Sequence, residues 1–500
     1  MKKMMTRVGI LLLTLCLLCP ALIALASCGG EKPSQSNETT ETTTGGSDPG
    51  KQPIVKIDYH DYLPKATYGF EEVTVLTDRP SAIFIEEDDI ASTFEQTVYQ
   101  RLVNVETKYE VFLNLKQVTY PPRENFHALC SESLAGGTAY DIVLEDYYYG
   151  LEAAGYYLNM MDYSNILHFE NPYWMSGWND SATIGGKLFS ALGSITMNAY
   201  ANAVVTFFNG LLAEDVGIER DYGENLYSMV DSGEWTLERM EEIMKRYSLD
   251  KSGDGTFGFE DNYGLGYNLW SGRALLVSCG LQMVEQDSDG LINFIDTSEK
   301  NVEIFNQVYH FLISDVCYYG GGAGSVESNQ GDRNLFVQNR ALFELNQLGA
   351  ASVFYAGLDK VGVLPLPKLD ASQADYISTI MGARPVAIMK NARDPEMSAT
   401  LIEALSIYGY EDIRPQYYES IKIRYQSDEE AAGIIDSIMD RIWIDFTFVN
   451  DGYFSGMSSI PFYLIEEKNR NYVSQMNSRC ANKEAWLKNL YKAYGVEVGE

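Results

Sequence analysis

The chain has 500 residues, of which 37 are basic and 70 are acidic, and its formal net charge is −33. This charge argues against nucleic acid or an anionic lipid surface as a partner, because binding to phosphates needs a basic patch. The main body, about 430 residues, is too long for one core, so the length predicts two lobes.

The N-terminus has the pattern of a bacterial lipoprotein signal peptide. Residues 1–27 combine a basic start, a long apolar run and small residues directly before Cys28. This pattern predicts cleavage before Cys28 and a lipid on its side chain. An uncleaved membrane helix is the alternative, because the apolar run approaches ~20 residues. Residues 28–65 begin with a stretch rich in Ser, Thr, Glu and Gly, and we expect a flexible linker there.

Four cysteines occur in the body of the chain. Their positions lack C-x-x-C spacing, which argues against a zinc site. One or two disulfides are one interpretation of a chain outside the cell, and four isolated buried thiols are the other. The four are Cys130, Cys279, Cys317 and Cys480.

Strands and helices alternate at the start of the body. The sequence predicts buried strands at 73–77, 111–118 and 139–144, and a helix at 90–109. This order is typical of an α/β fold, in which ligand-binding groups lie just past the carboxyl ends of strands. The polar residues in that place are Asp78 after the first strand and Glu145, Asp146 and Tyr147 after the third. A packed tyrosine corner is the alternative for Tyr147 to Tyr149.

An acidic loop follows a second predicted helix, for which Thr236 is the expected N-cap. The loop has oxygen-bearing residues at the spacing of a calcium-binding loop, with Gly255 at the sharp turn. A structural calcium ion is one interpretation, and a solvated acidic turn is the other. The expected calcium ligands are Asp250, Ser252, Asp254, Thr256 and Asp261.

The segment after this loop ends in a polar residue and a tryptophan. A strand at 263–267 leads to Asn268 and Trp270. A polar group beside a flat aromatic ring suits a sugar, which offers an apolar ring face and hydroxyl groups. A core tryptophan is the alternative for Trp270.

These features together resemble a known family. The string W-T, helix, D-x-x-G-D-G and D-x-Y-G-L between 235 and 265 is similar to that of bacterial extracellular solute-binding proteins of the carbohydrate type, relatives of maltose-binding protein. The segments G-K-L-F-S-A-L at 186–192 and V-G-V-L-P-L-P-K at 361–368 match as well. The resemblance runs from about 73 to 494, which is nearly the whole body.

The resemblance implies an α/β, two-lobed periplasmic-binding-protein-like fold with a ligand cleft between the lobes. Lobe I is expected to comprise 66–200 and 380–420, and lobe II to comprise 201–379 and 421–500. Two or three hinge segments would join them, with crossings near 196–203, 376–384 and 412–425.

The resemblance also implies a function. We expect a monomer that is lipid-anchored at the extracellular face of the cytoplasmic membrane, captures an oligosaccharide and passes it to ABC transporter permease subunits. We expect no catalytic residue and no required cofactor. The ligand-binding residues expected by position are Asp78, Glu145, Asp146, Tyr147, Asn268, Trp270, Asn346, Arg384 and Trp443.

Two other functions fit parts of the sequence. A secreted hydrolase acting on glycans would need two carboxylates across a cleft, and the acidic composition supplies many. The sequence contains neither G-x-S-x-G nor H-E-x-x-H, and its four histidines are far apart. The third interpretation is a cell-surface module for glycan adhesion.

Overall fold

The computed structural model describes residues 57–500 except 197, 322–330, 356, 423–428 and 498–500. The predicted signal peptide and Cys28 lie outside the described residues, as does most of the predicted linker. Tyr59–Glu500 form one compact unit. At its start, the Tyr59 N–H donates to Glu411 Oε1 at 3.0 Å and the Tyr59 ring packs edge-on against Tyr173. No helix among the described residues is long and apolar enough to cross a membrane.

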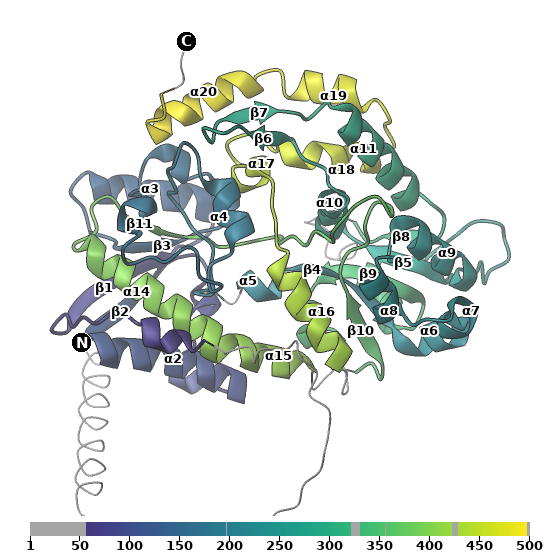
Figure 1. Ribbon diagram of the computed structural model, residues 1–500, viewed down its shortest axis with the longest axis horizontal. Coiled ribbons are helices and arrows are strands. Elements are labelled where there is room, and N and C mark those ends of the chain that lie inside the picture. Colours follow the sequence, from purple (N-terminus) through teal and green to yellow (C-terminus); the bar gives the residue numbers. More distant parts are fainter. Residues whose placement is uncertain (1–56, 197, 322–330, 356, 423–428, 498–500) are drawn as a thin grey trace, which may run out of the picture. The chain divides into compact units, whose positions relative to one another are not determined.

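A four-stranded sheet lies in the first part of this unit (Figure 1). Its strands, in spatial order, are β11 (Val386–Ile388), β3 (Ile142–Leu144), β1 (Glu71–Thr77) and β2 (Val111–Gln117). β1 is parallel to β2 and β3, whereas β11 is antiparallel to β3. The three strands predicted near the start of the body are therefore confirmed, with the third shorter than expected.

Helices cover both faces of this sheet. They are α2 (Thr93–Tyr109), α3 (Pro122–Leu134) and α14 (Pro395–Tyr408). Val73 and Val75 of β1 share an apolar cluster with residues of α2, whereas Leu76 belongs to a cluster with Phe126 of α3. Successive side chains of a strand point to opposite faces, so a strand buried on both sides is apolar throughout.

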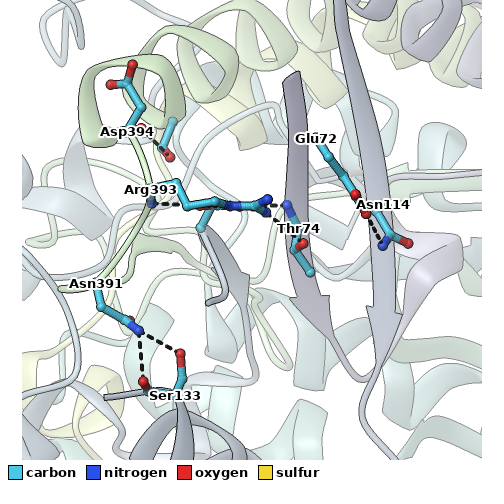
Figure 2. A network of polar contacts seen from close by, with 9 residues as sticks. Glu72, Thr74, Asn114, Ser133, Asn391, Arg393 and Asp394 are labelled. Carbon is cyan, nitrogen blue, oxygen red and sulfur yellow. Dashed lines mark hydrogen bonds and ion pairs between the residues drawn. The ribbon is translucent and has the colours of Figure 1, made fainter. Parts of the chain in front are cut away.

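A polar network ties the middle of β1 and the residue before β3 to the loop before α14 (Figure 2). The Asp141 carboxylate accepts the Thr74 N–H at 2.8 Å and the Arg393 Nη2–H at 2.6 Å. Arg393 also donates to Thr74 Oγ1 at 3.0 Å, and Asn391 Nδ2 donates to Ser133 Oγ at 2.9 Å. A cavity of about 480 Å³ lies beside this network, but Arg393, its buried charge partner Asp141 and the backbone already satisfy one another. The network therefore has a structural role, which is to hold these segments together.

A five-stranded sheet forms the centre of the second part. Its strands, in spatial order, are β10 (Val361–Leu364), β4 (Val204–Asn209), β9 (Ala341–Gln347), β5 (Tyr263–Tyr267) and β8 (Cys317–Tyr319). β5 is parallel to β9 and β8, and β4 is antiparallel to β9 and β10. The helices around it are α6 (Gly210–Val216), α7 (Ile218–Tyr222), α8 (Leu226–Ser232), α9 (Leu237–Tyr247), α10 (Leu269–Ser278), α12 (Gly331–Val337) and α13 (Ala350–Val353).

The chain crosses between the two sheets in two segments, and these segments run side by side. The first contains α5 (Asn198–Ala201), and the second precedes β11. The Val204 N–H donates to the Thr379 carbonyl at 3.0 Å, and the Met381 N–H donates to the Asn202 carbonyl at 3.1 Å. Both crossings lie where the sequence predicted them.

The predicted third crossing, 412–425, is helical over its described part. A π-helical turn, Gly409–Ile413, continues α14 into α15 (Arg414–Lys422), which packs on α2. Residues 423–428 lie outside the described residues. α16 (Glu429–Asp440) then packs on β10 and α8. The chain thus passes from the first sheet's helices to the second sheet between α15 and α16.

The remaining elements contact both sheet-bearing parts. α17 packs on α4, whereas α18 packs on α10. α20 contacts the 3-10 turn Glu152–Ala154. Their bounds are α4 (Ser176–Ala182), β6 (Val284–Gln286), β7 (Ile292–Phe294), α11 (Glu299–Leu312), α17 (Phe446–Val449), α18 (Ile460–Glu466), α19 (Tyr472–Arg479) and α20 (Lys483–Tyr494).

The four cysteines of the body are free thiols. Cys130, Cys279 and Cys480 are buried, and Cys317 is partly buried. Of the two interpretations of these cysteines, the structure supports isolated thiols. Burial raises the pKa of the Cys130 thiol to about 12, so this group is uncharged at neutral pH.

Candidate functional site

A cavity of about 440 Å³ lies where β5 and β9 end. Asn268 follows β5 directly, and Asn346 is the penultimate residue of β9. Since the two strands are parallel, their carboxyl ends meet at one edge of the sheet, which is where ligands bind in open α/β sheets. Three residues predicted from the sequence therefore line one cavity. The lining residues are Ala201, Asn202, Val204, Asn268, Trp270, Ser271, Arg333, Asn346, Gln347, Gly349, Ala350, Val353 and Phe354, and we call this space the strand-end cavity.

The Asn268 side chain is fixed by hydrogen bonds on both sides. Its Oδ1 accepts the N–H groups of Trp270 and Ser271 at 3.0 and 3.2 Å, which caps α10. Its Nδ2 donates to Asp332 Oδ2 at 3.0 Å. An amide nitrogen carries two hydrogens, and among the described residues Asp332 accepts only one of them. The other hydrogen can be donated to a ligand.

The Asn346 side chain is held by a buried glutamate and a tyrosine. Its Nδ2 donates to Glu344 Oε1 at 2.9 Å and to Tyr355 Oη at 3.2 Å. Tyr355 Oη in turn donates to Glu344 Oε2 at 2.5 Å. Burial first, and the nearby charge of Asp332 second, raise the pKa of Glu344 well above its ordinary value. Two buried acids, Glu344 and Asp332, thus orient the two amides of the cavity.

Aromatic side chains supply the flat surfaces of the strand-end cavity. Trp270 is partly buried, and the Arg273 guanidinium lies 5.4 Å from its ring centroid. Phe354 is 43% exposed, and the Arg333 guanidinium lies 4.2 Å from its ring centroid. Sequence reasoning missed Arg333 and Phe354. Val353 and Phe354 are adjacent apolar residues that the structure leaves exposed, which is typical of binding surfaces.

A second group of predicted residues gathers at the carboxyl ends of β1 and β3. The Arg384 guanidinium donates through Nε and Nη2 to both oxygens of Asp78, at 3.2 Å each. Its Nη2 also lies 3.5 Å from Asp146 Oδ2. Tyr149, another residue that sequence reasoning missed, donates to Asp78 Oδ2 at 3.1 Å.

The strand-end cavity and this ion-pair group meet on one crossing segment. Gln347 Nε2 donates to the Met381 carbonyl at 2.6 Å, and Asn202 Nδ2 donates to the Gly382 carbonyl at 2.7 Å. Both donors line the strand-end cavity. These two hydrogen bonds fix the backbone at Met381 and Gly382, just before Arg384.

Three further predicted residues lie away from the strand-end cavity. Glu145 is fully buried and accepts the Tyr157 hydroxyl at 2.7 Å. Tyr147 is also fully buried, with its ring centroid 5.5 Å from that of Trp178, so the structure has the packed tyrosine that was the alternative. The Trp443 N–H donates to the Ser378 carbonyl at 2.8 Å, in the region joining α16 to α17. The structure does not bring these side chains together with the cavity.

The acidic loop after α9 closes on itself. The backbones of Leu249 and Asn262 exchange two hydrogen bonds of 3.0 Å. Asp250 accepts the N–H groups of Gly253 and Gly255 at 2.7 and 2.9 Å. The Asp261 carboxylate accepts three N–H groups of its own loop, at 2.6 to 3.2 Å. The hydrogen bonds that Asp250 accepts lower its pKa, and the bond from the Gly255 N–H is the main cause.

The carboxylates of this loop point to backbone groups rather than to a common centre. Asp254 accepts both the N–H and the hydroxyl of Thr256, at 2.8 and 2.7 Å, and the Ser252 hydroxyl donates to Asp250 at 2.9 Å. Within the described part of the chain, no group of three or more His, Cys, Asp or Glu residues is arranged to hold a metal ion. Calcium binding by this loop stays a prediction.

The comparisons with known proteins give a match in structure alone. No protein-family model matches the chain, and no curated protein sequence matches it. The sugar-binding protein MalE from Xanthomonas citri superimposes with a TM-score of 0.57 at 12% identity, over 85% of this chain and 100% of that one.

Two further solved structures agree. A cyclo/maltodextrin-binding protein complexed with maltotetraose has a TM-score of 0.54 at 15% identity, over 86% of this chain and 99% of that one. The cyclic alpha-maltosyl-1,6-maltose binding protein from Arthrobacter globiformis has a TM-score of 0.53 at 14% identity, over 84% of this chain and 100% of that one. The fold is thus the two-lobed α/β fold of periplasmic binding proteins, and the resemblance predicted from the sequence is confirmed at the level of the fold.

Proposed function

We propose that this protein is a solute-binding protein that captures a carbohydrate in the strand-end cavity. The observation that carries the proposal is the combination of Trp270 with two preoriented amides, Asn268 and Asn346, at the carboxyl ends of β5 and β9. A ring face of a sugar stacks on an aromatic side chain, and its hydroxyls pair with amides and carboxylates. The volume, about 440 Å³, is in the range of small-molecule sites.

The ligand class follows from the fold neighbours together with this chemistry. One structural neighbour was solved with maltotetraose, and another is named for a cyclic maltosyl-maltose. We infer an oligosaccharide as ligand. The paired group Asp78, Asp146 and Arg384 is the proposed second contact surface, which the oligosaccharide would reach when the two lobes close on it.

Delivery to an ABC permease completes the proposed function. The predicted lipid on Cys28 would hold a monomer at the extracellular face of the cytoplasmic membrane, next to the permease. In this proposal the protein has no catalytic role and no required cofactor. Mass spectrometry of the mature protein tests the anchor: a chain that begins at a lipid-modified Cys28 is expected, and a longer chain with an unmodified Cys28 would contradict it.

The decisive experiment is a thermal-shift screen of the purified body with maltose to maltohexaose, followed by calorimetry of any hit. A ligand that binds only the folded state raises the melting temperature by mass action, so a saturable rise is expected. Product analysis by chromatography in the same samples should show intact sugar. Turnover of the oligosaccharide would instead support the glycan hydrolase, and binding to polymeric glycan alone would support the adhesion module.

A further inference from the structure

A second cavity, of about 570 Å³, lies between α8, the segment that follows β10, and α16. Figure 1 shows α16 beside β10, with α8 also in this part of the unit. The cavity shares no lining residue with the strand-end cavity. Its walls combine apolar side chains, Tyr227, Val230 and Ile434, with two cationic ones, Lys368 and Arg441.

The backbone of Lys368 is fixed by neighbours on both sides. Its N–H donates to the Trp235 carbonyl at 3.2 Å, and its carbonyl accepts the Leu237 N–H at 2.9 Å. This parallel pairing with Thr236 lies past the end of β10, which stops at Leu364. The backbone that carries the Lys368 side chain is therefore held in place by Trp235 and Leu237.

Lys368 lines the cavity and is only 5% exposed. Its Nζ lies 5.4 Å from the Tyr376 ring centroid, and a methyl group built on Gly233 would come within 3.1 Å of Nζ. Among the described residues, no hydrogen bond and no ion pair to this ammonium group is found, and the pKa of Asp370 is lowered first by the Ser372 hydroxyl and also by the charge of Lys368. A lysine this deeply buried is almost always paired, because a buried charge without a partner is costly. The ammonium group therefore has room for a closer negative partner from the cavity.

Arg441 adds a second cation at the mouth of the same cavity. It is exposed, and its Nη1 bonds with the carbonyl and hydroxyl of Ser437 one turn earlier in α16. A guanidinium offers five N–H donors in a planar fork, so most of them remain available for an oxyanion. The acids of the cavity, Asp231 and Asp375, are exposed at its rim, where water screens them.

We propose that this cavity is a binding site for a small organic anion, whose oxyanion group pairs with Lys368 and Arg441. The two rim acids disfavour a polyanion, so a ligand with one carboxylate or one phosphate is the better fit. The apolar wall would receive the body of the ligand. This site is independent of the proposed carbohydrate function, because it rests on other residues.

The test compares sodium benzoate, sodium phosphate and sodium chloride at equal ionic strength on the full body of the protein, by calorimetry and by thermal shift. Benzoate binding identifies a carboxylate site, and phosphate binding identifies a phosphate site. A saturable effect beyond chloride is expected for one of them. The proposal is overturned when neither anion differs from chloride.

Variants locate the site. Lys368→Met should weaken the binding of the active anion at least tenfold, whereas Lys360→Met, at an exposed lysine, should leave it unchanged. Arg441→Gln alters an exposed side chain and should weaken binding severalfold without affecting folding, so it remains informative if Lys368→Met folds poorly. The proposal is overturned if Arg441→Gln binds the anion as the wild type does and Lys368→Met either also does so or fails to fold. Trp270→Ala should keep the anion affinity of the wild type, which separates this site from the strand-end cavity.

Discussion

Arg384 and Asp78 form a bidentate ion pair although they are 306 residues apart in the sequence. The guanidinium is 3% exposed and the carboxylate 10% exposed, so the pair is almost wholly shielded from water. It joins the end of β1 to the crossing segment that returns to the first sheet. This contact links the fold of the first part directly to a hinge segment.

Replacing Arg384 with Met should destabilise the protein by about 3 kcal/mol. The substitution keeps the volume but leaves the carboxylate of Asp78 buried without its cation, and removing one partner of a buried pair has a cost of this order. Lys360→Met, which breaks the exposed pair with Glu214, should cost less than about 1 kcal/mol. Urea unfolding measures both. Equal losses in the two variants would show that the buried pair has no special role.

Replacing Trp270 with Ala should weaken oligosaccharide binding by ~1–3 kcal/mol, the usual cost of removing an aromatic anchor. Folding should be nearly intact, because the ring is only partly buried. Tyr120→Ala removes a ring that is 91% exposed and lies elsewhere, so its affinity should equal that of the wild type. Calorimetry gives the affinities. An unchanged affinity with a much lower melting temperature would mean that Trp270 is a core residue.

Replacing Glu145 with Gln should change how stability depends on pH. Burial, and then the charge of Glu152, raise the pKa of Glu145 well above its ordinary value. The native state therefore keeps this proton to a higher pH than the unfolded chain does. The resulting stabilisation is complete below the ordinary pKa and is lost as the pH rises through the native pKa. The Gln side chain is neutral at every pH, so the variant does not lose this stabilisation as the pH rises.

Urea unfolding between pH 4 and 8 measures the effect of Glu145→Gln as a difference from the wild type. The variant should gain stability relative to the wild type as the pH rises. Glu87→Gln, at an exposed position, controls for the loss of one carboxylate. A difference between Glu145→Gln and wild type that stays constant over this range would contradict the assigned protonation.

Calcium at the loop 250–261 is testable by titrating chelator-treated protein. If the ion binds, calorimetry should show a saturable heat at or below millimolar calcium, and the melting temperature should rise. Asp254→Asn should reduce both, because it removes one of the expected ligands. Neither heat nor a shift in melting temperature would leave the hydrogen-bonded turn as the correct interpretation.

Local features of this protein could be predicted from the sequence alone. Thr236 was expected to cap a helix, and its side chain accepts the N–H group of Arg239. Asp141 stands directly before the apolar run 142–144, and it accepts the Thr74 N–H. Such bonds join residues close in sequence or follow from the position of an acid before an apolar run, so composition and spacing are sufficient to identify them. The order of the elements indicated an α/β fold, and the family resemblance supplied its two-lobed form.

Long-range contacts were decided by the tertiary structure. α16 ends at Asp440, and the backbone of Ser378 pairs with Arg441 and Trp443 directly after it. Glu145 and Asp78 both follow strands, yet one lies in the interior and the other meets Arg384. Arg333 reaches the strand-end cavity from α12, whereas Phe354 reaches it from the end of α13. No spacing rule predicts these outcomes, since burial and charge pairing depend on which distant segments pack together.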